Sequence, residues 1–171
     1  ICGMGTDHLM VQGVAGLHDS SFRVEGDRIV AGTYGAAAVA AGGEVLLRGI
    51  CPSDLKVPLE EFQKAGAAVD ADEENCQIRI CMRKRPLPLL IKTEPYPGFP
   101  TDLQSPFMAF LATALGTSYI EEQVFEGRFA TAKILEQMGA VIRTENQRAV
   151  IEGHYPLKGA AAVSYTHLRA H

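Results

Sequence analysis

The sequence lacks an apolar run of 18 residues and a secretory signal pattern, so neither a membrane span nor export is predicted. Long basic runs are also missing. The longest is Arg83-Lys84-Arg85, and the net charge is −4. Nucleic-acid phosphates need a basic surface, which this composition does not supply. We therefore expect a cytoplasmic protein that contacts neither a membrane nor nucleic acid.

Cysteines are few, and their spacing matches no metal-binding pattern. There is no C-x-x-C pair and no histidine pair near a cysteine, so neither a zinc site nor a disulfide framework is predicted. We expect buried thiols in a reducing compartment, and neither a metal nor a cofactor. The four cysteines are Cys2, Cys51, Cys76 and Cys81.

The composition is that of a folded protein. Of its 171 residues, 47% are hydrophobic and 21% are charged, which is enough to bury a core. The chain can therefore form one domain, or one large lobe of a longer protein. Its first residue is Ile1 rather than methionine, so we expect a piece of a longer chain.

An internal repeat with an offset of 73 residues organises the chain. Gly43 and Gly116 each follow a helical stretch, and Gly66 and Gly139 each end a helix before a strand. Each copy consists of a helix, a strand, a helix and two short strands, which predicts an α/β (α+β) fold of helices packed on sheets. The expected strands are 44–50, 67–72 and 77–82 in the first copy, and 119–125, 140–143 and 149–152 in the second.

The two ends of the chain fit a third, split copy. Residues 7–14, "DHLMVQGV", resemble residues 147–153, "QRAVIEG", which close the second copy. Residues 154–163 resemble the start of a further connection between units. We therefore expect a lobe cut from a ring of such units.

The stretch "YPGFPTDLQSPF", residues 96–107, stiffens the backbone just before a single carboxylate, Asp102. The prolines on both sides of Gly98-Phe99 restrict this loop before the chain folds. One interpretation is structural, because aspartate is a preferred helix N-cap and prolines often precede helices. The alternative is that the rigid loop positions a reactive carboxylate.

Several stretches carry a resemblance to a known family. They are "GMGTDHLMVQGV", "GDRIVAGTYGAAAVAAGGEV", "PYPGFPTDLQ", "VFEGRF" and "ILEQMGA". Together they resemble the family of UDP-N-acetylglucosamine 1-carboxyvinyltransferases, which are enolpyruvyl transferases, from Ile1 to Val163. The resemblance implies an inverse α/β barrel lobe built from repeated βαβαββ units. Residues 1–163 would be one lobe, with units at about 28–95 and 100–153, the split third unit at the ends, and a non-native tail at 164–171.

The resemblance also implies an activity. The family transfers enolpyruvyl from phosphoenolpyruvate to the 3′-hydroxyl of UDP-N-acetylglucosamine and releases phosphate, the first committed step of peptidoglycan synthesis. The expected partners are these two small molecules and a second lobe of the same protein. That lobe carries the family's catalytic cysteine, so the fragment alone is expected to be inactive. The alternatives are a 3-phosphoshikimate 1-carboxyvinyltransferase-like enzyme and a non-catalytic binding module.

Four site residues follow from the resemblance. Asp102 matches the family's catalytic and substrate-binding aspartate, and would accept or orient the proton of the 3′-hydroxyl. Val124 matches a position whose backbone meets the nucleotide-sugar, although a core valine is the ordinary interpretation. Arg128 and Arg28 match arginines that line the substrate cleft, where guanidinium groups suit phosphate and carboxylate, although either could be a surface arginine.

Other positions receive structural interpretations. Lys92 reads as a solvated charge at a strand end, Phe99 as a packing residue, and Thr101 as the helix cap if Asp102 is catalytic. Cys51 lacks the cationic neighbours of a reactive thiolate and is not expected to be the catalytic thiol. Gly127 departs from the family, which usually has asparagine at this position.

Overall fold

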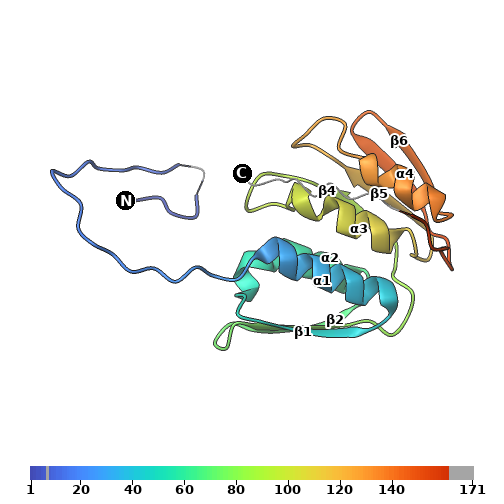
Figure 1. Cartoon of the computed structure of the whole chain (residues 1–171), viewed down its shortest axis with the longest axis horizontal. Helices are drawn as coiled ribbons and strands as arrows, with labels where there is room; N and C mark the ends of the chain where they lie inside the picture. The colour runs from blue at the N-terminus through green and yellow to red at the C-terminus, as the bar shows by residue number, and fades with distance from the viewer. Residues whose placement is uncertain (7, 162–171) are drawn as a thin grey trace.

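A computed structural model describes residues 1–6 and 8–161, and the chain from residue 28 onward forms two modules of helices packed on sheets (Figure 1). The sheet of the first module has the strand order β1-β3-β2, and both pairings are antiparallel. The elements of the first module are α1 (Arg28–Ala41), β1 (Glu44–Arg48), a 3₁₀ turn (Pro52–Leu55), α2 (Lys56–Lys64), β2 (Ala68–Asp72) and β3 (Gln77–Cys81).

The second module repeats this order and adds one strand. Its sheet has the order β4-β5-β7-β6, in which β4 and β5 are parallel and the other pairs are antiparallel. Its elements are β4 (Leu90–Lys92), a 3₁₀ turn (Thr101–Leu103), α3 (Gln104–Leu111), β5 (Thr117–Glu121), α4 (Ala130–Gln137), β6 (Val141–Glu145) and β7 (Arg148–Glu152).

The helices of each module end where the sequence places glycine. The helix α1 stops at Gly42, whose backbone is left-handed with a φ of 65° and whose N–H donates to the carbonyls of Ala38 and Val39. Gly66 and Gly139, with φ angles of 97° and 95°, follow α2 and α4 in the same way. Glycine adopts positive φ without the steric cost that a side chain adds, so these helix ends were predictable.

The expected strands are confirmed to within two residues, with one exception. The strand expected over 119–125 stops at Glu121, and that prediction is wrong beyond this residue. The reason is that the next residue, Glu122, is buried and its carboxylate accepts hydrogen bonds from the backbone N–H groups of Val124 and Phe125. These bonds turn the chain into a loop that a β-strand pattern does not reveal.

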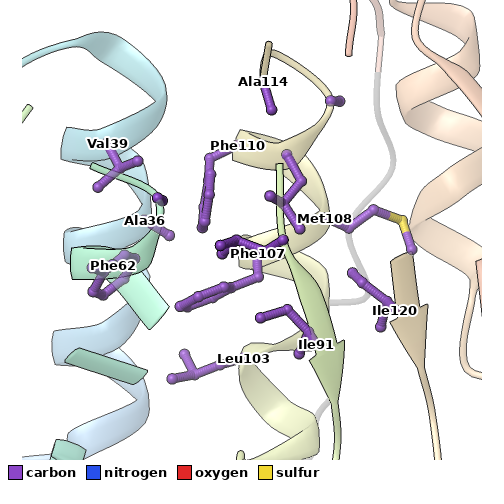
Figure 2. Packing of buried hydrophobic residues seen from close by; sticks show 14 of the residues in the cluster. Ala36, Val39, Phe62, Ile91, Leu103, Phe107, Met108, Phe110, Ala114 and Ile120 are labelled. Atoms are coloured by element: carbon purple, nitrogen blue, oxygen red, sulfur yellow. The ribbon is translucent and has the colours of Figure 1, made fainter. Parts of the chain in front are cut away.

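The core lies between the two sheets, where α1 packs against α3 (Figure 2). Phe107 on α3 is fully buried and stacks on Phe62 of α2, with the ring centroids 4.7 Å apart. Small residues on α1 permit this close approach. A Cβ atom added at Gly32 would lie 2.5 Å from a methyl carbon of Leu103, and one at Gly35 would lie 2.8 Å from Ile80. The two modules therefore share one core rather than forming separate domains.

The chain before α1 extends away from both modules (Figure 1). Within its described residues, its only β-bridge joins Cys2 to Met10, and apolar side chains such as Leu17 and Phe22 are 94% and 80% exposed. Apart from that bridge, the described part of residues 7–14 forms no strand, so the split third unit stays a prediction. The tail expected at 164–171, together with residues 162–163, lies outside the described residues.

Two further expectations can be compared with the structure. None of the described helices is both long and apolar enough to cross a membrane. The prediction of buried thiols is wrong. One cysteine, in the segment before α1, is exposed, and the other three, at or near strand ends, are only partly buried. The exposed cysteine is Cys2, and the partly buried ones are Cys51, Cys76 and Cys81.

Candidate active site

The loop before α3 is fixed by its own backbone and by the core. The N–H of Glu94 donates to the carbonyl of Phe99 at 3.0 Å, and the N–H of Gly98 donates to Pro95 at 2.8 Å. A Cβ atom at Gly98 would lie 2.5 Å from that of Glu94, so the turn requires glycine. Phe99 is buried and meets Phe107 edge-on at 4.8 Å, which confirms its packing role. The loop therefore delivers residues 101 and 102 at a defined place.

Asp102 does not cap the helix. The start of α3 has no side-chain cap, either at the 3₁₀ turn that precedes it or at its own N-cap residue Leu103. Instead, an oxygen of Asp102, Oδ1, accepts a hydrogen bond from Nη2 of Arg128 at 2.5 Å. The Asp102 side chain is 53% exposed and that of Arg128 only 20%, so the arginine supports the carboxylate from the protein side.

Thr101 does not cap the helix either, so that prediction is wrong. Its hydroxyl donates to Oε2 of Glu122 at 2.8 Å and accepts from Nη1 of Arg128 at 3.0 Å. The hydroxyl is thus engaged by two side chains, and no side chain caps the backbone N–H groups at the start of α3. Thr101 instead links a buried carboxylate to the arginine that holds Asp102.

Glu122 is the centre of this network and was not identified from the sequence. It is fully buried, and a buried carboxylate is costly unless donors surround it. Oε1 accepts from the hydroxyl of Thr93 at 2.8 Å and from the backbone N–H groups of Val124 and Phe125 at 3.0 and 3.1 Å. With Thr101 on Oε2, four donors converge on one carboxylate. The available signal was an acidic pair inside the run "YIEEQVF", whose two ends are apolar.

Val124 is half-buried and lies on the loop that Glu122 organises. Since its N–H is taken by Glu122, the backbone group that it can offer to a ligand is its carbonyl. Arg128 lies on the same loop, with its guanidinium 5.1 Å from the centroid of the Phe125 ring. The structure thus brings three of the four expected site residues together, namely Asp102, Val124 and Arg128.

Arg28 lies elsewhere. At the start of α1, its guanidinium is 5.3 Å from the centroid of the Tyr96 ring, on the loop before α3. Within the described residues, the hydrogen-bond network of Asp102 does not include Arg28. Arg28 instead lines a cavity of about 420 Å³ together with Lys56 and the start of α2. The carboxylates of Asp54 and Glu60 line it as well, so its formal charges balance and Arg28 and Lys56 are its two groups that can pair with an anion.

A second cavity of about 420 Å³ lies beyond β5, at the turn between β6 and β7. Glu122 and Gln123 line it, so the loop of the buried carboxylate separates this cavity from Asp102. Asp102 lines neither cavity and faces open solvent instead. In residues 1–6 and 8–161, no group of three or more histidine, cysteine, aspartate or glutamate side chains could hold a metal ion.

Comparisons with known proteins place this geometry in a family. The sequence model of EPSP synthase, described as 3-phosphoshikimate 1-carboxyvinyltransferase, matches residues 1–171. The chain belongs to the EPSP synthase family. Proteins named UDP-N-acetylglucosamine 1-carboxyvinyltransferase from Hyphomonas neptunium and Brucella ovis are 44% and 43% identical to it over 99% of the chain. The chain spans only 40% and 39% of their lengths.

Two solved structures share the fold. The enolpyruvyl transferase NikO from Streptomyces tendae has a TM-score of 0.62 at 25% identity, over 74% of this chain and 30% of that chain. EPSP synthase from Acinetobacter baumannii has a TM-score of 0.60 at 20% identity, over 82% of this chain and 34% of that chain. The predicted α/β fold of the enolpyruvyl transferase type is confirmed.

One departure from the family, at Gly127, and one prediction for a strand end, at Lys92, can be compared with the structure. Gly127 has a φ of 66°, a left-handed conformation that both glycine and asparagine tolerate, so the loop geometry accommodates either residue. Lys92 ends β4 and pairs with Glu121 at 3.1 Å with about half of its side chain exposed, as expected of a charge at a strand end.

Proposed function

We propose that this chain is part of a UDP-N-acetylglucosamine 1-carboxyvinyltransferase, which moves enolpyruvyl from phosphoenolpyruvate to the 3′-hydroxyl of UDP-N-acetylglucosamine and releases phosphate. The observation that carries the proposal is the half-exposed carboxylate of Asp102, held at the start of α3 by Arg128. The names of the two relatives support the choice of substrates. In this proposal, the chain contributes to the first committed step of peptidoglycan synthesis.

Asp102 is the proposed base. The attacking alcohol must lose its proton as it adds to phosphoenolpyruvate, and a positioned carboxylate about 3 Å away typically contributes a factor of about 10² to 10⁴ in rate. Arg128 occupies Oδ1, and within the described residues Oδ2 accepts no hydrogen bond, which leaves it for the 3′-hydroxyl. The network from Glu122 through Thr101 to Arg128 limits the movement of this base, and small misplacements are costly.

The other site residues have proposed binding roles. The carbonyl of Val124 would accept a hydrogen bond from the nucleotide-sugar, because its N–H already binds Glu122. Arg128 would face the developing charge near Asp102 as well as hold that carboxylate. Arg28, beside Lys56 in the cavity at the start of α1, would bind a phosphate or carboxylate group of a substrate.

The organisation of the complete protein is also a proposal. Residues 1–163 would form one lobe, with units at about 28–95 and 100–153 and a split third unit at the ends. A second lobe of the same protein would supply the catalytic thiol. The activity would take place in the cytoplasm and serve cell-wall biogenesis, cell shape, the cell cycle and cell division.

Phosphate release separates this proposal from its alternatives. A full-length transferase that carries this sequence should release phosphate from phosphoenolpyruvate with UDP-N-acetylglucosamine and not with shikimate 3-phosphate. The reverse preference would support the 3-phosphoshikimate enzyme, whose name the family carries. Binding of UDP-N-acetylglucosamine without phosphate release would support a non-catalytic module. The isolated 171-residue chain should release no phosphate, and heat-sensitive release by it would contradict the two-lobe mechanism.

A further inference from the structure

Two cysteines far apart in the sequence meet in the first module. The sulfur atoms of Cys51 and Cys76 are 2.8 Å apart although 25 positions separate the residues, and both are free thiols. Cys51 follows β1, and Cys76 ends the turn between β2 and β3. Both are partly buried, so small molecules can reach them.

The backbone holds the two thiols in place. The N–H groups of Gly49 and Ile50 both donate to the carbonyl of Cys76, at 2.9 and 3.3 Å. The hydroxyl of Ser53 reaches the carboxylate of Glu73 across the same two loops at 3.5 Å. The sulfur atoms need to approach by less than an ångström to reach a disulfide bond length of about 2.05 Å.

We propose that Cys51 and Cys76 form a reactive dithiol site that reduces a low-molecular-weight disulfide and closes to an intramolecular disulfide bond. In the first step, the thiolate of Cys76 attacks one sulfur of the reagent, forms a mixed disulfide and releases one thiolate. In the second step, the sulfur of Cys51 attacks the Cys76 sulfur and displaces the second thiolate. The two leaving thiolates take up the two protein protons, so one dithiol is oxidised and one disulfide is reduced to two thiols.

The order of the two steps follows from the local electrostatics. The hydrogen bond with Cys76, followed by burial, raises the pKa of Cys51 to about 11, so Cys51 keeps its proton at neutral pH. The first attacking sulfur is therefore that of Cys76. Once Cys76 is in a mixed disulfide, it no longer carries the negative charge that opposes ionisation of Cys51. The two causes of the raised pKa that come from Cys76 are thus lost when Cys51 has to attack, whereas burial still raises the pKa of Cys51.

The bond would tie a loop that borders a cavity. Ser53 and Asp54, just after Cys51, line the same cavity as Arg28. A disulfide bond between Cys51 and Cys76 would join the segment that lines this cavity to the turn between β2 and β3. The ligand of the site is a small disulfide such as oxidised glutathione. The reaction leaves a disulfide bond between Cys51 and Cys76, beside the cavity that Arg28 lines.

The test uses the 171-residue chain with Cys2→Ser and Cys81→Ser, which leaves only the proposed pair. After treatment of the folded chain with oxidised glutathione, we expect a mass lower by about 2 Da and no retained glutathione. The matched control carries Cys2→Ser and Cys76→Ser, which leaves Cys51 and Cys81. It should retain glutathione or stay unreacted. Circular dichroism checks that both variants are folded.

Retained glutathione on Cys51 or Cys76, or no reaction of the folded pair, would overturn the proposal. If the double variant does not fold, the unmodified chain is oxidised, blocked and digested, and the two cysteines should appear in one linked peptide. Absence of that peptide would count equally against the proposal. The oxidised chain should melt roughly 5–10 °C higher than the reduced chain, and a reducing agent should reverse this shift. An unchanged melting temperature would contradict the formation of a stabilising disulfide bond between Cys51 and Cys76.

Discussion

The two modules use the same backbone connection with different side chains. In the first, the N–H of Gly49 donates to the carbonyl of Cys76 at 2.9 Å, and in the second, the N–H of Glu122 donates to that of Gln147 at 2.8 Å. Gly49 has no side chain to organise its loop, whereas Glu122 gathers four donors. The comparison teaches that one added carboxylate can turn a structural loop into the support of a candidate active site.

The starts of the two equivalent helices differ in the same way. Asp27 caps α1, and its Oδ1 accepts from the backbone N–H groups of Ile29 and Val30 at 2.7 and 3.1 Å. Thr101 and Asp102 stand at the start of α3 without capping it. A cap is typically worth about 1 kcal/mol, which α3 gives up so that these two side chains can serve the network.

The sharpest test of this difference is Asp102→Asn in a full-length transferase. Asparagine keeps an oxygen for Arg128 but cannot take up the proton of an alcohol, so kcat should fall by about 10² or more. The melting temperature should hardly change, because an ion pair this exposed contributes about 0–1 kcal/mol. Asp70→Asn, an exposed carboxylate on β2, is the matched control and should leave kcat unchanged. Near-normal turnover of Asp102→Asn at saturating substrates would falsify the catalytic assignment.

A second test removes the negative charge of Glu122, which distinguishes its loop from the equivalent loop at Gly49. Glu122→Gln replaces an acceptor oxygen with a donor facing Thr101, which leaves the network partly unsatisfied. The free energy of unfolding should fall by about 1–3 kcal/mol in a denaturant titration.

The control for Glu122 is its neighbour Glu121, whose partly exposed side chain pairs with Lys92. Glu121→Gln should change the free energy of unfolding by less than about 1 kcal/mol. If both variants lose the same stability, burial of the Glu122 carboxylate is not what supports the loop.

The smallest expected effect concerns the cap of the first module. Asp27→Ala should lower the free energy of unfolding by about 1 kcal/mol, because two N–H groups of α1 lose their acceptor. Asp27→Asn should restore most of this loss, since asparagine caps about as well. The matched change Thr101→Ser keeps the hydroxyl of the second module and should cost less than Asp27→Ala. Equal stability of Asp27→Ala and the unmodified chain would remove the contrast between the two helix starts.

Much of the fold could be predicted from the sequence, because its signals are local. The glycines at 42, 66 and 139 end helices through their own backbone freedom, and the repeat gives the order of the elements. The end of β5 at Glu121 could not be predicted in this way. Its cause is a set of hydrogen bonds that Glu122 makes after the chain has folded.

The candidate site could also be predicted only in part from the sequence. The resemblance to the family proposed Asp102, Val124 and Arg128 as site residues, and the stiff loop before α3 marked the carboxylate as unusual. The sequence alone left two roles open for Asp102, and it assigned a cap to Thr101 that the structure does not contain.

By itself, the sequence determined the fold class, the repeat, the helix ends and the positions of the candidate carboxylate and arginine, since these depend on local backbone preferences and recognisable motifs. Only the tertiary structure decided that Glu122 is the buried centre of the candidate site, that Arg28 lies outside its hydrogen-bond network, and that Cys51 meets Cys76. Each of these facts joins residues distant in the sequence. Burial and hydrogen-bond partners are set by packing between modules and loops, which no local pattern encodes.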